Sequence, residues 1–366
     1  MDQDKREAAG NEKDIDTSWR LNRRQALKLS AGMAGVLAGV ASGAGRLLAQ
    51  DGPGVYLPLV SGGIGSSQGS QQVRLFASGT GNDEEEIARR RAAVEAAFGN
   101  TTGTLIDYRV FKFSLPRTDI TATIMGLPVA PDLALEGMVT IQAHAGREAM
   151  KFMLALLDEE VNPVLTALLA SNLGTQLEIF SALHNHYLQD DPPIKFIHGL
   201  ATGVAEEMAA TLYDVLSNNS GTPFGHGEAP PGDPGFDWEA VAAMIGGTAE
   251  LHNGVLTIAV PRNIQFVARG VVLAQEMMMS HEFKFQATGG TVLNLNEFVV
   301  LKDEAVGAAR LLRERGFMVS ALHNHELDIR PQAYHLHAAG TGDALALAQL
   351  LRELLDLAGG GTAVLP

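Results

Sequence analysis

The stretch Ser320-Ala321-Leu322-His323-Asn324-His325 occurs twice in this chain, because Ser181-Ala182-Leu183-His184-Asn185-His186 repeats it residue for residue. In each copy another histidine follows fourteen residues after the first one, at His198 and at His337. A six-residue match with a further histidine at the same distance indicates an internal duplication. The sequence therefore predicts two homologous repeats, each organised around a histidine-rich hairpin.

The segments around the two copies also match in order. Leu115-Pro116-Arg117 ends an alternating apolar segment in the first repeat, and Val260-Pro261-Arg262 ends its equivalent in the second. Alternating segments are typical of strands, and capped segments with helical periodicity are typical of helices. The expected strands span residues 104–115, 138–143, 150–157, 176–186 and 194–198, then 255–260, 282–287, 291–301, 317–325 and 333–337. The expected helices span 84–98, 163–171, 204–216, 303–315 and 343–357. We therefore predict an α+β fold of two tandem repeats, each a mostly antiparallel sheet flanked by helices.

The N-terminal region has the composition of an export signal followed by a tether. Arg23 and Arg24 precede a run over residues 29–40 that is rich in Gly, Ala, Leu and Val. This order is typical of a twin-arginine signal, although a basic cluster beside an N-terminal anchor helix has a similar composition. We expect a protein that is periplasmic, extracellular or associated with the cell envelope, with no stable membrane span after signal removal. The expected division is a signal segment at 1–50, a Gly/Ser-rich tether at 51–82, repeats at 83–217 and 237–366, and a Pro/Gly-rich linker at 218–236.

The composition excludes several functional classes. Hydrophobic residues make up 46% of the 366 residues and charged residues 19%, which suits a globular protein with a core. The chain has no cysteine, so disulfides, thiolate ligands and cysteine nucleophiles are excluded, and a metal would be held by His, Asp, Glu or Asn. The net charge of −15 makes the surface repel phosphate groups. We therefore expect no nucleic-acid partner.

The histidine hairpins have the pattern of a metal site. Because side chains alternate along a strand, the two histidines of each His-Asn-His motif point to one face. An antiparallel return strand brings the third histidine of that repeat beside the pair. Three imidazoles with an open fourth position are typical of catalytic zinc, and iron, nickel and copper also accept imidazole. The sequence predicts a divalent metal, Zn or another imidazole-binding transition metal, with His323, His325 and His337 as favoured ligands and His184, His186 and His198 as their counterparts.

The second repeat carries additional polar groups. His335 stands where the first repeat has Phe196, and it shares a face with His337. Glu326 directly follows the motif, where the first repeat has Tyr187. A carboxylate there could bind the metal, support a ligand or act as the general base of a metal-activated water. We name Glu326 as the catalytic candidate. An arrangement in which the two halves pack about a pseudo-twofold axis and both hairpins line one shared cleft also fits.

Less specific interpretations apply to several of these residues. Imidazoles at strand ends also brace turns by hydrogen bonding to the backbone. Arg117 and Arg262 could bind an anionic ligand, although a salt bridge is the favoured role. The run Met277-Met278-Met279 could bind a soft metal, although an apolar approach to a strand is favoured.

The chain resembles the LppY/LpqO family of bacterial envelope proteins. The resemblance rests on the Leu-Pro-Arg and Val-Pro-Arg segments, the Ala-Leu-His-Asn-His element, the Pro-containing loop that ends in His, and Gln286-Ala287-Thr288-Gly289-Gly290. It covers residues from about 90 to 358 and is closer in the second repeat. The resemblance implies an exported protein with a domain of no assigned function, and it implies no catalytic residue. The named members are lipoproteins, whereas this chain has paired arginines and no cysteine for a lipid anchor.

Three functional hypotheses follow from these patterns. The leading one is an exported protein that binds a divalent metal or a small polar ligand through the hairpins, and that could be a metal-dependent enzyme. The second is a non-catalytic envelope module whose histidines brace a sheet and whose acidic surface binds an envelope component. The third is a metal chaperone or buffer. The substrate, the metal and the oligomeric state are left open by the sequence.

Overall fold

The computed structural model describes residues 83–173, 178–179, 184–227 and 229–357. All of these residues belong to one compact unit. The expected signal segment and tether, residues 1–82, lie outside the described residues, and so does most of the strand expected over 176–186. Within the described part of the chain, no helix is both long and apolar enough to cross a membrane.

The two repeats have closely similar orders of elements. The first repeat contains α2 (Asp83–Ala97), β1 (Thr104–Ile106), β2 (Val110–Pro116), β3 (Ala122–Ile124), β4 (Leu127–Val129), α3 (Pro131–Ala134), β5 (Glu136–His144), β6 (Arg147–Leu157), α4 (Asp158–Ala170), β7 (Glu178–Ile179), β8 (Asp190–Asp191), β9 (Ile194–Gly203) and α5 (Ala205–Asn219). The second contains α6 (Trp238–Ile245), β10 (Thr248–His252), β11 (Val255–Pro261), β12 (Phe266–Ala268), β13 (Val271–Leu273), β14 (Ser280–Thr288), β15 (Thr291–Leu301), α7 (Ala305–Glu314), β16 (Met318–His323), β17 (Ile329–Arg330), β18 (Ala333–Gly342) and α8 (Ala344–Leu357).

Each repeat forms one large antiparallel sheet, and the two sheets have equivalent strand orders. The order is β1-β2-β5-β6-β9-β7 in the first repeat and β10-β11-β14-β15-β18-β16 in the second. The central neighbours β5/β6, β6/β9, β14/β15 and β15/β18 all pair antiparallel. The predicted α+β fold with two homologous repeats is therefore confirmed.

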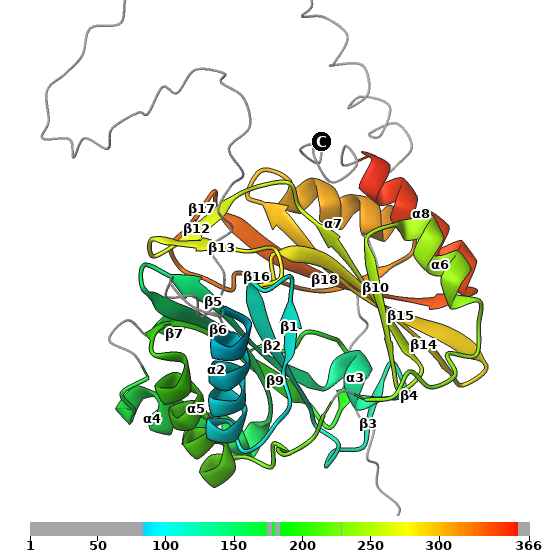
Figure 1. Ribbon diagram of the computed structural model, residues 1–366. Helices are drawn as coiled ribbons and strands as arrows, with labels where there is room; N and C mark the ends of the chain where they lie inside the picture. The colour runs from blue at the N-terminus through cyan, green and yellow to red at the C-terminus, as the bar shows by residue number, and fades with distance from the viewer. Residues whose placement is uncertain (1–82, 174–177, 180–183, 228, 358–366) are drawn as a thin grey trace, which may run out of the picture. The chain divides into compact units, whose positions relative to one another are not determined.

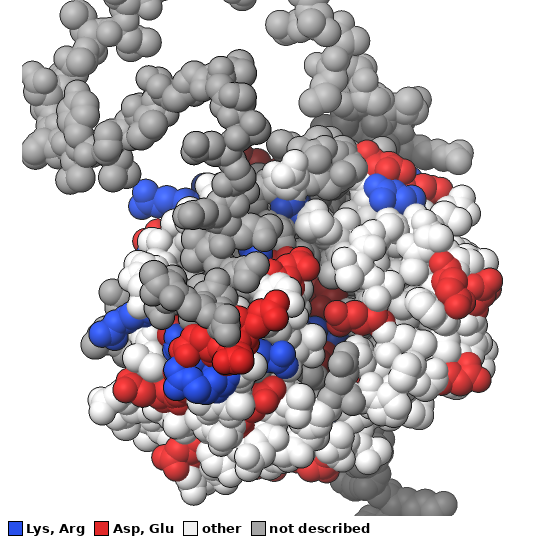
Figure 2. All heavy atoms as spheres, viewed as in Figure 1, with Lys and Arg blue, Asp and Glu red and all other residues white. Residues whose placement is uncertain are grey.

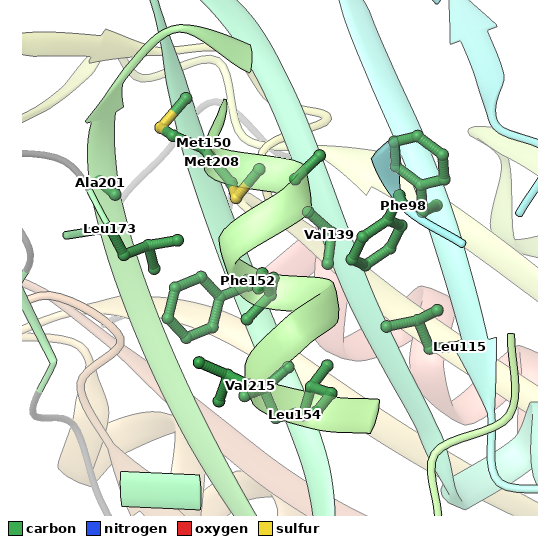
Figure 3. Packing of buried hydrophobic residues seen from close by; sticks show 14 of the residues in the cluster. Phe98, Leu115, Val139, Met150, Phe152, Leu154, Leu173, Ala201, Met208 and Val215 are labelled. Carbon is green, nitrogen blue, oxygen red and sulfur yellow. The ribbon is translucent and has the colours of Figure 1, made fainter. Parts of the chain in front are cut away.

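Helices cover the outer face of each sheet. In Figure 1, α2, α4 and α5 lie over the first sheet, and α6, α7 and α8 lie over the second. Alternate strand residues point outward into these two cores; Figure 3 shows Met208 and Val215 of α5 among Phe152 and Leu154 of β6 in the first core. In the second core, Phe298 has the position of Leu154, and Leu336 has that of Ile197. The other face of each sheet therefore faces the sheet of the other repeat.

The inner faces of the two sheets meet through apolar groups supplied by both repeats. Each repeat also forms a small three-stranded sheet, β4-β3-β8 in the first and β13-β12-β17 in the second. Phe266 of β12 belongs to a cluster with Val110 and Leu200 of the first repeat. Ile124 of β3 belongs to a cluster with Leu295 of the second repeat. The small sheet of each repeat thus packs against the other repeat, and two apolar clusters lie between the large sheets.

Two local expectations were wrong in detail. The segment 104–115 is a hairpin and not a single strand, because Asp107 and Tyr108 have left-handed backbones, with φ of 50° and 55°, that close a tight turn. Helix α4 begins at Asp158 and contains Pro163, which we expected to begin the helix. The Glu160 carboxylate accepts a hydrogen bond from the Leu157 amide at 2.8 Å, so the acidic first turn supplies the cap.

A buried arginine joins a strand end to a helix in both repeats. Arg117 donates to the Glu160 carboxylate at 2.7 Å and to the Ala155 carbonyl at 2.9 Å. Arg262 donates to the Glu304 carboxylate and, at 2.9 Å, to the Val299 carbonyl. The favoured salt-bridge role of both arginines is therefore confirmed, although the glutamate partners are buried and only Asp119, a second partner of Arg117, is partly exposed.

Substitution Glu304→Ala leaves the Arg262 guanidinium buried without its carboxylate, so we expect the free energy of unfolding to fall by about 3–5 kcal/mol. Urea denaturation followed by circular dichroism measures the change. Glu353→Ala is the matched control, because it removes an exposed pair with Arg315, 34% and 42% exposed, and should cost less than about 1 kcal/mol. Equal costs for the two variants would contradict a structural role for the buried pair.

Candidate metal centre

The seven repeat histidines lie between the two sheets. His198 of β9 and His335 and His337 of β18 point inward, because the strand residues between them point into the outer cores. His323 ends β16, where it pairs in register with His335. His184 forms the equivalent bridge to Phe196 in the first repeat. The second histidine of each motif, His186 or His325, lies just beyond this pairing and is buried.

The imidazoles of the two repeats pack against one another. Ring centroids are 3.7 Å apart for His184 and His323, 4.1 Å for His186 and His337, and 3.8 Å for His198 and His325. Each of these three pairs takes one ring from each repeat. The structure therefore has a single centre shared by both hairpins, which was the alternative to one site in each repeat.

Four of the histidines form one group of candidate ligands. One ring nitrogen from each lies within 4.8 Å of the corresponding nitrogens of the others, and the members are His184, His186, His198 and His323. Around a tetrahedral zinc with Zn–N bonds of about 2.0–2.1 Å, ligand nitrogens are about 3.3 Å apart. Modest rotations of the rings would bring this group to that spacing.

A second group contains a carboxylate that the sequence analysis did not select. Glu297 of β15, His325 and His335 place their ligand atoms within 4.8 Å of one another. The carboxylate of Glu297 is 2.5 Å from His335 Nδ1 and 4.0 Å from His325 Nε2. The sequence signal for Glu297 is a charged residue within the apolar part of the strand 291–301. Its inward position opposite His337 follows from the sheet register.

His337 lies between the two groups. Its Nε2 is 2.9 Å from His323 Nε2 and 3.9 Å from a Glu297 carboxylate oxygen. The predicted ligand set His323, His325 and His337 is thus divided: His323 falls in the first group, His325 in the second, and His337 contacts both. The two groups are close enough to act as one centre with two positions for a cation.

The buried imidazoles are held neutral, which is the form that binds metals. Burial lowers the pKa of His335 to about 3 and that of His337 to about 4. Burial and the neighbouring histidines also lower the pKa values of His186, His198 and His323 well below the ordinary range. These five imidazoles therefore carry no positive charge at neutral pH.

Several ring nitrogens have no hydrogen-bond partner among the described residues. They include His186 Nε2, both nitrogens of His198, His335 Nε2 and His337 Nδ1, all of which are buried. A buried polar atom without a partner costs about 1–3 kcal/mol. Coordination of a cation would satisfy one nitrogen of each ring that binds it, so the residues present fit a bound metal.

Glu326 lies apart from both groups. Its carboxylate is 2.6 Å from Lys151 Nζ of the first repeat, and both side chains are buried. The ion pair joins the two repeats beside the histidines. The role of Glu326 as a general base stays a prediction.

Comparison with known proteins identifies the repeated domain. The family model DUF1529, described as Domain of Unknown Function (DUF1259), matches residues 92–218 and again residues 239–357. The chain belongs to this family. The two matches confirm two tandem copies of one domain. No curated protein and no solved structure matches the chain.

The two DUF1529 domains differ at the second group of ligands. His335 corresponds to Phe196, since each pairs with the first histidine of its own motif. Glu297 lies opposite His337, and its counterpart Met153 lies opposite His198. The first domain therefore has Met and Phe where the second has Glu and His, and only the second domain can supply the carboxylate-containing group.

A cleft between the two DUF1529 domains reaches the second group. It has a volume of about 340 Å³, and its lining includes Glu297 and His325 together with Met138, Met153, Met278 and Glu282. Figure 2 shows Asp and Glu side chains gathered in the hollow between the two domains. A small molecule that enters this cleft would meet the Glu297 group and not the four-histidine group.

The neutral histidines make the metal-free protein sensitive to acid. A histidine whose pKa is lower in the folded protein than in the unfolded chain, where it is about 6.5, takes up a proton on unfolding. The stability that is present above about pH 6.5 is therefore lost as the pH falls toward the folded pKa values of about 3 for His335 and about 4 for His337. For EDTA-treated protein we expect His335→Phe to reduce the slope of unfolding free energy against pH between about pH 6.5 and 4 by up to about 1.4 kcal/mol per pH unit.

The control is Phe196→Leu, which changes the equivalent stacked ring without removing a titratable group. Urea denaturation across this pH range should give the Phe196→Leu variant a lower stability with the wild-type slope. An unchanged slope for His335→Phe would show that His335 does not contribute to the acid sensitivity.

Proposed function

We propose that this protein is an exported metal-binding protein whose centre is assembled jointly by its two DUF1529 domains, and that it acts as a metal-dependent enzyme on a small molecule. The supporting observation is the set of buried ring nitrogens without hydrogen-bond partners, contributed by both domains to one centre. Zinc or another imidazole-binding transition metal suits these ligands.

The two ligand groups suit different roles. The group of His184, His186, His198 and His323 offers four imidazoles, which is the ligand number of a closed structural zinc site. The group of Glu297, His325 and His335 offers three ligands and borders the cleft, so a coordination position is left for a substrate or water. We assign the chemistry to this second group.

A divalent ion held there would supply Lewis-acid polarisation and an activated water. The residues of the chain would do the rest. Glu297, whose carboxylate is 2.5 Å from His335 Nδ1, would hold the ion together with His335 and His325. Glu282, which lies opposite Glu297 in register on β14, faces the same cleft and is placed to exchange a proton with a bound molecule.

Export and envelope location form part of the proposal. The paired Arg23 and Arg24 before an apolar run support twin-arginine export, a route that carries folded proteins. The similarity to LppY/LpqO envelope proteins supports the same location. The partner would be a small molecule or an envelope component, and the net charge of −15 disfavours nucleic acid.

One observation favours the alternative of bracing histidines. His323 and His337 share a hydrogen bond at 2.9 Å, and His335 contacts Glu297, so part of the cluster is satisfied without a metal. The same ligands in a chaperone or buffer would bind metal without turnover. Metal content and turnover separate these cases.

Protein purified without a His tag from its native export route should contain close to one or two equivalents of metal by elemental analysis. His323→Ala/His325→Ala removes one ligand from each group, so this variant should lose the metal. The matched control is His144→Ala/His252→Ala, which alters two histidines outside both groups and should keep the metal. A folded wild-type protein without metal would favour bracing histidines.

A second pair of variants assigns the two groups. His184→Ala/His198→Ala should lose metal from the first group and reduce thermal stability, because a structural metal contributes to folding. Glu297→Gln/His335→Phe should keep that metal and its stability but abolish turnover in a screen of hydrolase and lyase substrates. Wild-type turnover that survives Glu297→Gln/His335→Phe would contradict the assignment of chemistry to the second group.

A further inference from the structure

We propose that the cleft between the domains contains a separate thioether site for Cu(I), formed by Met138, Met153 and Met278. It rests on the proposed function in one respect, because the inner end of the cleft is the metal centre. The three methionines belong to neither ligand group.

The two walls of the cleft have opposite chemistry at equivalent positions. Met138 of β5 and Met153 of β6 lie directly opposite each other in register, and both line the cleft. Their counterparts in the second domain are Glu282 of β14 and Glu297 of β15, which are also a register pair and also line the cleft. Directly opposed residues have Cβ atoms about 4.5–5.5 Å apart, so the two thioethers of the first domain can reach one ion.

Met278 supplies the third sulfur from the other domain. The preceding and following residues, Met277 and Met279, are completely buried in the apolar cluster with Phe266. Met278 has a left-handed backbone with φ of 57°, which is uncommon for a residue without a short polar side chain. This conformation directs Met278 into the cleft while its neighbours enter the core. A strained residue that lines a cleft marks a position where the side chain has a role.

The chemistry of these ligands selects the ion. Thioethers are soft ligands that select Cu(I), whereas zinc and other harder divalent ions prefer imidazole and carboxylate. The chain has no cysteine, so methionine is its strongest soft ligand. His325 lies at the inner end of the same cleft and can complete the coordination. Glu276 and Glu282 on the cleft lining favour the approach of a cation.

The test compares wild-type protein with Met138→Leu/Met153→Leu/Met278→Leu. Leucine keeps the apolar volume, and such exchanges usually cost less than about 1.5 kcal/mol each. The control variant, Met125→Leu/Met208→Leu/Met244→Leu, removes three thioethers away from the cleft lining. Cu(I) affinity is measured without oxygen by competition with bicinchoninate, and NMR of ¹³C-methyl methionine reports which thioethers bind.

We expect the cleft variant to lose more than about tenfold in Cu(I) affinity, or about 1.4 kcal/mol, while the control keeps the wild-type value. In wild-type protein, Cu(I) should shift three methionine methyl signals that are missing from the cleft variant. Equal affinities for the wild type and the cleft variant, or no Cu(I) binding by the wild type, would overturn the proposal.

Zinc separates this proposal from the proposed function. The cleft variant should keep the zinc content of wild type, because its substitutions leave both ligand groups intact. His184→Ala/His198→Ala should lose zinc from the first group but keep its Cu(I) affinity. A wild-type protein that holds zinc and ignores Cu(I) would overturn the thioether site alone, whereas a protein that binds Cu(I) in the cleft and holds no zinc would overturn the metal centre alone.

Discussion

The burial of six imidazoles between two sheets, with a seventh half-buried beside them, is the constraint around which this structure is built. A buried imidazole must stay neutral or find a charged partner, and burial lowers the pKa values of these histidines accordingly. Neutral rings still carry polar nitrogens that need partners. The apolar clusters on either side of the histidines hold the sheets together without satisfying those nitrogens. A bound cation would ease the conflict, because it would bind the neutral rings and satisfy one nitrogen of each ring that holds it.

Duplication explains how such a centre is assembled. Each domain contributes one hairpin, and the rings of one domain pack against those of the other, so neither domain can form the centre alone. Two ion pairs also join the domains. Lys151 of the first domain pairs with Glu326 of the second, and Lys284 of the second pairs with Glu136 of the first. These buried pairs specify one arrangement of the domains, because a shift would leave charges buried without partners.

Divergence between the copies then separates their roles. Both domains keep the motif, the arginine–glutamate pair and the outer core, because these features determine the fold of each copy. The inward positions of the central strands differ: the first domain presents Met138 and Met153 where the second presents Glu282 and Glu297. Two methionines at these positions in one domain and two glutamates in the other cannot arise from two identical copies. The difference makes the single shared centre asymmetric, because only the carboxylate-containing group borders the cleft.

The sequence alone determined the duplication, the α+β class and the histidines that would face one side of each hairpin. These features depend on periodicity and on residues close together in the chain, where the geometry of a strand decides which side chains share a face. The carboxylate Glu297 was not selected, because it lies on a strand far from the motif and only sheet register brings it to His335 and His337. Only the tertiary structure decided that His323 and His325 belong to different ligand groups, that Glu326 pairs with Lys151, and that the two hairpins form one centre. These outcomes depend on how two sheets pack face to face, and contacts across that interface leave no regular spacing in the sequence.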